Sequence, residues 1–438
     1  MPFADLGDDI LLNVLALCDV YRVLTVSAID KRLRGLTQAK QLWLSLIQDS
    51  TFRNILELRP SSREELECLS TRELVDLVKH AVIGPPQWWP GGPSSSRTPA
   101  YTITCETGVE HFWGSYVLLP GARYIVFGSH STEDLCMFDI WNGRRVWTFA
   151  KENNHTCCAI DLVPGGATAR VVVAVAGEYV GRGYYIHVEE IDLTTGASHE
   201  VFRLGFATQL HSISAIVGDF FLYSPVSSIT PFSDVKSVLV NWRESTYVVL
   251  NYGTPTNSAA ILIPGHIVAT HPYTRAPYHQ LLTVTALESF APYWMPLTGI
   301  TLSDQLLPKT IPITARERQE YHGVPLGDSK HTHVTLSITP NAVYEGAYTI
   351  VTHTGEFPKP STITAQVGAL FTGKRLADSG RAVQLTYSLR PPLAPGQASA
   401  LRLVSAQLAT PGMGSGGRIP PRAVVAQSRG SFTVSYYQ

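Results

Sequence analysis

Hydrophobic positions in the first 83 residues recur with the period of an α-helix. Their spacing predicts amphipathic helices over residues 7–18, 20–36, 41–47 and 70–82, because side chains three or four positions apart lie on one side of a helix. The hydrophobic positions of the first helix are Ile10, Leu11, Val14, Leu15 and Cys18. We therefore expect the chain to begin with a small α-helical unit.

Polar residues stand where these helices are expected to begin. Asp8 or Asp9 is predicted to cap the first helix and Asp19 the second, because a side-chain oxygen can accept from the free backbone N–H groups of the first turn. Two serine–glutamate pairs have the spacing of a capping box, Ser62 with Glu65 and Ser70 with Glu73. The second box opens the helix over residues 70–82.

From residue 101 onward the pattern changes to short apolar strands divided by glycine turns. Four such hairpins repeat at steps of 44, 53 and 47 residues, with their turns at Gly121, Gly165, Gly218 and Gly265. A second signature places an aspartate four residues before a glycine, in Asp139 with Gly143 and in Asp192 with Gly196. Two hairpins in each unit of about 40–50 residues are typical of a propeller blade. The predicted fold class is therefore α+β and multidomain, a helical unit followed by an all-β propeller-like domain.

The expected domain boundaries follow from these patterns. Residues 1–50 are predicted to form three short helices, 51–83 a helical linker, and 101–438 a degenerate propeller of five to seven blades whose closing strand the sequence does not identify. Between them lies a linker at 84–100, in which eleven of 17 residues are Gly, Pro or Ser. Proline fixes the backbone and removes hydrogen-bond donors, so we expect an extended spacer that uncouples the two domains, with Trp88 and Trp89 as an anchor.

Charge and cysteine content narrow the class of protein. The net charge is −1, which gives no electrostatic signal for nucleic acid or an anionic membrane surface. The six cysteines contain no CxxC pair, and the acidic N-terminus does not resemble a signal peptide. We expect reduced thiols, no membrane span, and a cytoplasmic or nuclear location.

The sequence contains no motif for nucleotide, phosphate or metalloprotease chemistry. His331 and His333 alternate along a predicted strand and could bind a metal together with His322 or His353, but an exposed polar edge is the simpler interpretation. Asp139 and Asp192 end strands, which favours a role in stabilising turns. We expect no catalytic residue and no cofactor.

Residues 4–47 resemble an F-box. The matching positions are Leu6, Ile10, Leu11, Leu15, Val23, Leu24, Ile29, Lys31, Arg32, Leu42 and Trp43. The sequence departs from the family at Gly7, Asp30 and Leu33, where the family has Pro, Cys and Trp. An F-box followed by a propeller is similar to the substrate receptors of SCF-type cullin ubiquitin ligases. The resemblance implies docking on a Skp-family adaptor, and through it on a cullin, while the propeller binds an unknown target protein.

The helical unit also has more hydrophobic residues than three short helices can bury among themselves, so the surplus must cover a neighbouring domain or a partner. The expected adaptor-binding residues are Leu6, Ile10, Leu11, Leu15, Val23, Leu24, Ile29, Leu42 and Trp43. The alternative is that these residues pack on the helix over 71–82. Two other functions stay open, namely a non-ligase interaction scaffold and a propeller enzyme.

Overall fold

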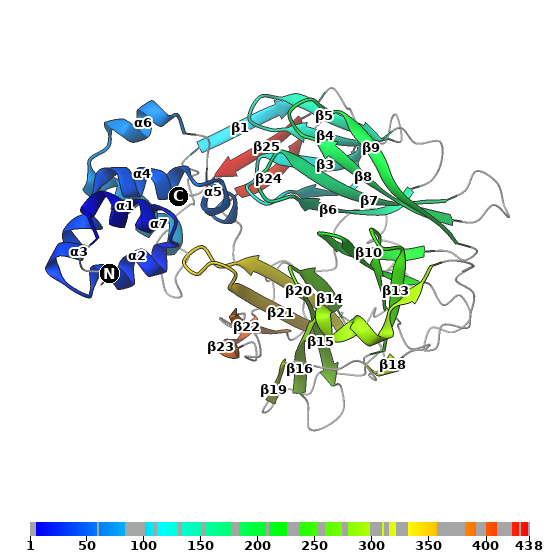
Figure 1. Ribbon diagram of the computed structural model, residues 1–438. Coiled ribbons are helices and arrows are strands. Elements are labelled where there is room, and N and C mark those ends of the chain that lie inside the picture. Colours follow the sequence, from blue (N-terminus) through cyan, green and yellow to red (C-terminus); the bar gives the residue numbers. More distant parts are fainter. Residues whose placement is uncertain are drawn as a thin grey trace.

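The structure is a computed structural model in which helices precede a series of antiparallel sheets (Figure 1). It describes residues 6–58, 61–83, 101–107, 112–129, 134–149, 155–176, 184–206, 210–225, 237–251, 259–273, 279–297, 309–310, 315–320, 332–356, 382–390, 400–409, 423–428 and 431–436. The predicted linker at 84–100, with Trp88 and Trp89, lies outside these ranges, as do His322 and His331.

The N-terminal part of the chain is helical, as predicted. Its helices are α1 (Asp8–Ala16), α2 (Val20–Ser27), α3 (Lys31–Leu36), α4 (Lys40–Gln48), α5 (Ser50–Ile55), α6 (Arg63–Cys68) and α7 (Thr71–Ile83). The single helix expected over residues 20–36 is two helices. The Asp30 carboxylate accepts from the Leu33 N–H at 2.8 Å and begins α3, so the residue that departs from the F-box pattern is a helix cap.

The other caps are largely as the sequence indicates. Asp19 caps α2 through the Arg22 N–H at 2.7 Å, and both capping boxes are formed. The first helix differs, because Gly7 occupies its cap position and no side chain caps it. Asp8 instead pairs with Arg32 at 2.6 Å.

One hydrophobic core holds the helical unit together. Its buried members are Leu15, Val20, Val23, Leu42, Trp43, Leu46, Ile47, Phe52, Leu56, Leu58, Leu66, Leu74, Val78 and Ala81. They come from both sides of the boundary expected at residue 50, and α4 packs directly on α7. The segment that was expected to be a separate linker is therefore part of the same packed unit.

The β part is propeller-like. Four of its sheets have four antiparallel strands in chain order. The first sheet is β2 (Phe112–Leu118), β3 (Tyr124–Ser129), β4 (Leu135–Asp139) and β5 (Arg144–Phe149). The second is β6 (His155–Leu162), β7 (Thr168–Ala176), β8 (Tyr184–Asp192) and β9 (Ser198–Phe206). The fourth is β14 (Ala259–Ile263), β15 (His266–Tyr273), β16 (His279–Ala286) and β19 (Ala315–Glu320). The fifth is β20 (Thr332–Pro340), β21 (Tyr348–Glu356), β22 (Ala382–Arg390) and β23 (Ala400–Ala409).

Two sheets depart from this plan. In the third, the strands β10 (Leu210–Val217), β11 (Phe220–Pro225), β12 (Ser237–Asn241) and β13 (Thr246–Asn251) are joined at β13 by β17 (Met295–Pro296) and β18 (Lys309–Thr310). A 3₁₀ helix, η3 (Leu287–Tyr293), precedes β17. The last sheet, called here the closing sheet, consists of β1 (Tyr101–Glu106), β25 (Ser431–Tyr436) and β24 (Ala423–Ser428). Its register pairs Tyr101 with Tyr436 and Glu106 with Ser431, so both ends of the domain meet in one sheet.

The glycine repeat is confirmed as a structural repeat. Gly121, Gly165, Gly218 and Gly265 each lie in the turn between the first and second strands of a sheet, all with positive φ. Gly346, which the sequence reading did not connect with the repeat, takes the same position in the fifth sheet at φ 73°. The turn requires the left-handed backbone region, which glycine adopts without a steric penalty.

Apolar clusters join neighbouring sheets around the domain. Shared clusters connect the closing sheet with the first, and then the first with the second, the second with the third, the third with the fourth, and the fourth with the fifth. Among the described residues, no cluster joins the fifth sheet to the closing sheet. In Figure 1 these two sheets both face the helical unit, which lies beside the space between them.

Candidate functional site

Eight of the nine predicted adaptor-binding residues fall into two groups by burial, and the ninth, Leu6, is half-buried. Five of them lie inside the helical unit, namely Leu11, Leu15, Val23, Leu42 and Trp43. Trp43 is 4% exposed, and its indole N–H donates to the Thr37 carbonyl at 2.7 Å. These five side chains are core residues and are not available to a partner in this structure. The alternative of internal packing therefore applies to them, and in part against α7.

A second group is exposed. Ile10, Leu24 and Ile29 are exposed hydrophobic residues, and Ile29 is 65% exposed. Three further residues share this property although they were not among the predicted contacts, namely Val14, Leu17 and Tyr21. These six side chains lie on α1 and α2 or in the turns that follow these helices, and they are called here the α1–α2 apolar face: Ile10, Val14, Leu17, Tyr21, Leu24 and Ile29. The helical unit thus exposes several hydrophobic side chains, and three of these six were not among the predicted adaptor contacts.

The helical period separates the buried residues of α1 from the exposed ones. Leu11 and Leu15 are four positions apart and point α1 into the core. Ile10, Val14 and Leu17 form a second stripe with the same period on a different side of α1, and Leu17 at its end is 87% exposed. Exposed apolar side chains on adjacent turns are a common mark of a contact surface for another protein. The i, i+4, i+7 spacing of Ile10, Val14 and Leu17 was the signal available in the sequence.

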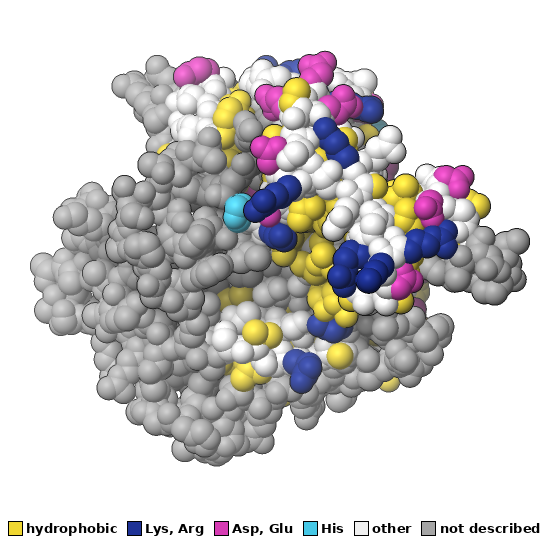
Figure 2. Space-filling model, turned by 90° about the vertical axis from the view of Figure 1, so that its left-hand side faces the viewer, with side chains coloured by type: hydrophobic (Ala, Val, Ile, Leu, Met, Phe, Trp, Pro, Cys, Tyr) yellow, Lys and Arg dark blue, Asp and Glu magenta, His cyan; other side chains and the backbone are white. Residues whose placement is uncertain are grey.

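Charged groups surround this face. Arg32 donates to Asp8 at 2.6 Å and to the Leu6 carbonyl at 2.7 Å, which ties the half-buried Leu6 to the start of α3. Figure 2 shows hydrophobic side chains on this side of the molecule between groups of basic and acidic side chains. A hydrophobic centre with a polar rim is the usual composition of a protein–protein interface.

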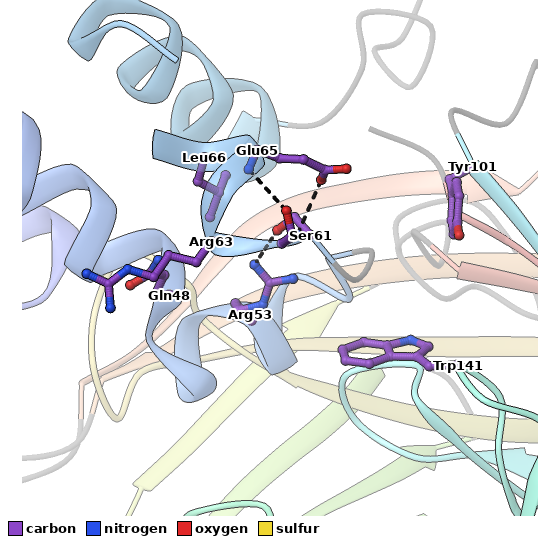
Figure 3. Close-up of a pocket in the computed structure, with 9 residues that line it drawn as sticks. Gln48, Arg53, Ser61, Arg63, Glu65, Leu66, Tyr101 and Trp141 are labelled. Atoms are coloured by element: carbon purple, nitrogen blue, oxygen red, sulfur yellow. Dashed lines mark hydrogen bonds between the residues drawn. The ribbon is translucent and has the colours of Figure 1, made fainter. Parts of the chain in front are cut away.

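A cavity of about 590 Å³ lies between the helical unit and the closing sheet. Figure 3 shows Tyr101 and Trp141 on one side of it and the helical residues on the other. Its charged side chains already have partners within the protein. Arg53 donates to Ser61 Oγ at 3.1 Å, Arg63 pairs with Glu67 at 2.6 Å, and Glu65 belongs to a capping box. The cavity therefore lies at the boundary between the helical unit and the β part, and its charged side chains are engaged within the protein.

The two aspartates of the second sequence signature stabilise turns. Asp139 is fully buried and accepts from Arg123 at 2.8 Å and from the Trp141 N–H at 3.1 Å. Asp192 accepts from the Thr194 hydroxyl at 2.6 Å, and these hydrogen bonds lower the pKa of Asp192 to about 2. Both carboxylates are satisfied within the fold, so neither is arranged as a proton donor or acceptor for a substrate.

The histidines of the fifth sheet do not assemble a metal centre among the described residues. His353 is buried in β21 opposite Thr335 of β20, while His333 stands opposite Gly355. No group of three His, Cys, Asp or Glu side chains in the described ranges could hold a metal ion. Within the same ranges, no helix has the length and apolar character needed to span a membrane.

Comparison with known proteins supports no family assignment. No protein-family model matches the chain, and no curated protein matches it. Solved structures with similar folds include the β-propeller domain of Cps50 (Swd1) from Myceliophteria thermophila, with 11% identity and a TM-score of 0.36, covering 78% of this chain and 100% of that one. Another is the WD40 domain of SCAP from fission yeast, with 9% identity and a TM-score of 0.28, covering 75% and 80%. Scores this low carry no argument about function, and the propeller-like assignment rests on the strand order of the sheets.

Proposed function

We propose that this chain is the substrate-recognition subunit of an SCF-type ubiquitin ligase, in which the α1–α2 apolar face docks a Skp-family adaptor and the propeller-like domain binds the target protein. Such a subunit does no chemistry itself. It raises the effective concentration of a target lysine near the transferring enzyme. The proposal includes an association with a cullin through the adaptor and a cytoplasmic or nuclear location.

The observation that carries the proposal is the exposure of hydrophobic residues on two consecutive helices of a small unit. Fully burying a side chain of this size contributes about 1.5–3 kcal/mol, so a partner that covers the exposed parts of these side chains would gain free energy from their burial. The resemblance of residues 4–47 to an F-box supports an adaptor as that partner. The corrected contact set omits the five core residues and adds Val14, Leu17 and Tyr21.

Co-purification of the full chain with a Skp-family adaptor tests the proposal. The Val14→Asp, Leu17→Asp double variant places two charges on the apolar face, and we expect at least tenfold weaker adaptor binding. Val404→Asp is the matched control, because Val404 on β23 is a similarly exposed hydrophobic residue far from the helical unit in sequence. Equal binding by the wild type and the double variant would reject this face as the adaptor site.

A non-ligase interaction scaffold is the second candidate. The same exposed face favours it, because an apolar surface identifies an interface without identifying the partner. If the wild-type chain fails to bind any Skp-family adaptor but another protein binds it and is lost in the Val14→Asp, Leu17→Asp variant, the scaffold function replaces the ligase function.

A further inference from the structure

We infer that the helical unit stabilises the propeller-like domain by holding the fifth sheet and the closing sheet together, and we call this role the clasp. It acts at the junction between these two sheets, whose described residues share no apolar cluster. This role concerns the fold of the chain alone and holds whether or not an adaptor binds. It reverses the expectation that a Pro/Gly-rich spacer uncouples the two domains.

The first attachment joins α2 to the hairpin turn between β20 and β21. The ring centroids of Tyr21 and Tyr344 are 4.1 Å apart. The Tyr21 N–H donates to the Val343 carbonyl at 3.1 Å, and the Glu345 N–H donates to Asp19 Oδ2 at 3.2 Å. The first hydrogen bond joins two backbone groups, and the second joins a backbone N–H of the turn to the carboxylate that caps α2, so together they orient the turn on the N-terminus of α2.

Side chains strengthen the same contact. Arg22 lies 3.5 Å from the Glu345 carboxylate, although both groups are largely exposed and the pair contributes little by itself. Ala342 packs on the hydrophobic core of the helical unit. The hairpin thus contributes a residue to the helical core as well as touching its surface.

The hairpin turn is built to present these groups. The Asn341 side chain accepts from the N–H groups of Val343 and Tyr344 at 2.8 and 3.0 Å. Gly346 adopts a positive φ, and the Arg390 guanidinium of β22 lies 4.3 Å from the centre of the Tyr344 ring. A turn that is held from within loses little conformational entropy on docking.

The second attachment joins α5 to the first sheet, which shares an apolar cluster with the closing sheet. Asn54 of α5 lies against Gly121 in the β2–β3 turn. Gln48, Arg53 and Leu66 face Tyr101 and Trp141 across the cavity of Figure 3. Trp141 in turn donates to the Tyr436 hydroxyl at 3.1 Å. The helical unit therefore contacts the fifth sheet through α2 and, through α5, the first sheet that packs on the closing sheet.

Hydrogen exchange on the full chain tests the clasp. We expect Tyr21→Ala to raise the exchange rates of amides in β20 and β21 at least fivefold, although the substitution is in a helix, and Tyr344→Ala to raise those of α2. Val404→Ala, in an exposed position on β23, is the control and should change neither region. If Tyr21→Ala does not fold, Tyr21→Leu removes the ring contact while keeping an apolar side chain on α2.

A double-mutant cycle completes the test. If the two rings act as one contact, the Tyr21→Ala, Tyr344→Ala double variant should show nearly the same exchange rates as either single variant. Unchanged exchange in β20 and β21 for Tyr21→Ala or Tyr21→Leu would overturn the inference, and so would fully additive effects. Because no adaptor is present, this result is independent of the proposed ligase function.

Discussion

Gly121 in the β2–β3 turn lies directly against Asn54 of α5, and a Cβ placed on Gly121 would be 2.5 Å from the Asn54 side-chain oxygen. The backbone at Gly121 also has a φ of 89°. Two features therefore require a glycine at this position, namely its left-handed backbone conformation and the close approach of α5. The turn and the helix are so close that a larger side chain at Gly121 would require Asn54 to move.

Gly121→Ala is expected to destabilise the protein more than Gly143→Ala. Gly143 has a similar positive φ of 71°, but nothing lies within 4 Å of its Cβ position. A left-handed non-glycine residue costs about 1–2 kcal/mol, and the contact with Asn54 adds to that at Gly121 alone. Thermal unfolding of both variants measures the difference. Asn54→Ala should recover part of the loss in Gly121→Ala, and the prediction fails if the two glycine variants unfold alike.

The core leucines of α1 are expected to matter for folding. Leu11→Ala should destabilise the helical unit by about 2–5 kcal/mol, because Leu11 is 1% exposed. Leu17→Ala, on the exposed stripe of the same helix, should change stability by less than about 0.5 kcal/mol. Urea unfolding followed by circular dichroism distinguishes them. Equal stability of the two variants would mean that α1 packs with a different side towards the core.

The fully buried turn aspartate, Asp139, should contribute more to stability than its half-buried equivalent, Asp192. Asp139→Ala removes the partner of Arg123 and of the Trp141 N–H, and hydrogen bonds to a charged group are worth about 1.5–3 kcal/mol each. Asp192→Ala breaks a similar set of bonds in a solvated turn, where water replaces them, so its effect should be smaller. Denaturant midpoints of the two variants give the comparison, and an equal or reversed order would contradict it.

His187 is expected to make stability depend on pH. It is buried in β8 with Glu189 and Glu200 at 3.6 and 3.7 Å, and Arg203, Tyr185 and Phe149 also face it. Burial lowers the pKa of His187 below its usual 6.5, although both carboxylates act in the opposite direction. The unfolded chain therefore binds the proton first as the pH falls through 6.5, and the native state loses stability until the pH passes below the lowered pKa.

Urea midpoints at pH 7.5, 6.5 and 5.5 measure this dependence. We expect His187→Phe to flatten the decrease between pH 6.5 and 5.5, because each unit of pKa difference is worth about 1.4 kcal/mol. His199→Phe is the control, since His199 on the neighbouring strand is 70% exposed. A wild-type decrease that survives in His187→Phe would assign the effect to other groups.

Local features of the fold were readable from the sequence because each depends on few neighbouring residues. The glycine turns and the two serine–glutamate capping boxes are of this kind. The third sheet shows the limit. There Asn241 accepts from the Glu244 N–H at 3.1 Å, and Ser245 takes the positive φ that glycine has in the first two sheets. The turn between the third and fourth strands keeps its backbone geometry in this sheet, but it lacks the aspartate and the glycine. The aspartate–glycine signature therefore could not identify it in the sequence.

Features that depend on distant residues could not be read in this way. Leu11 and Ile10 are adjacent in sequence, yet one is buried and the other exposed, and the helical period alone does not say which stripe faces the core. The contact between Tyr21 and Tyr344 joins parts of the chain that share no sequence signal. The composition of the linker at 84–100 suggested independence, but contacts made elsewhere on the surface decide whether two domains are coupled.

The pairing of β1 with β25 determines when the closing sheet can form during synthesis of the chain. A ribosome synthesises β1 before the other described strands of the domain and β25 after them, so the sheet that contains both cannot form until translation reaches residue 436. Contacts between such distant segments form slowly, because the chain loses the entropy of closing a long loop before the contacts contribute any stability. A growing chain would therefore contain several completed sheets while β1 still lacks its partner strand. The unpaired strand edge and the apolar surface beside it are then available to molecular chaperones.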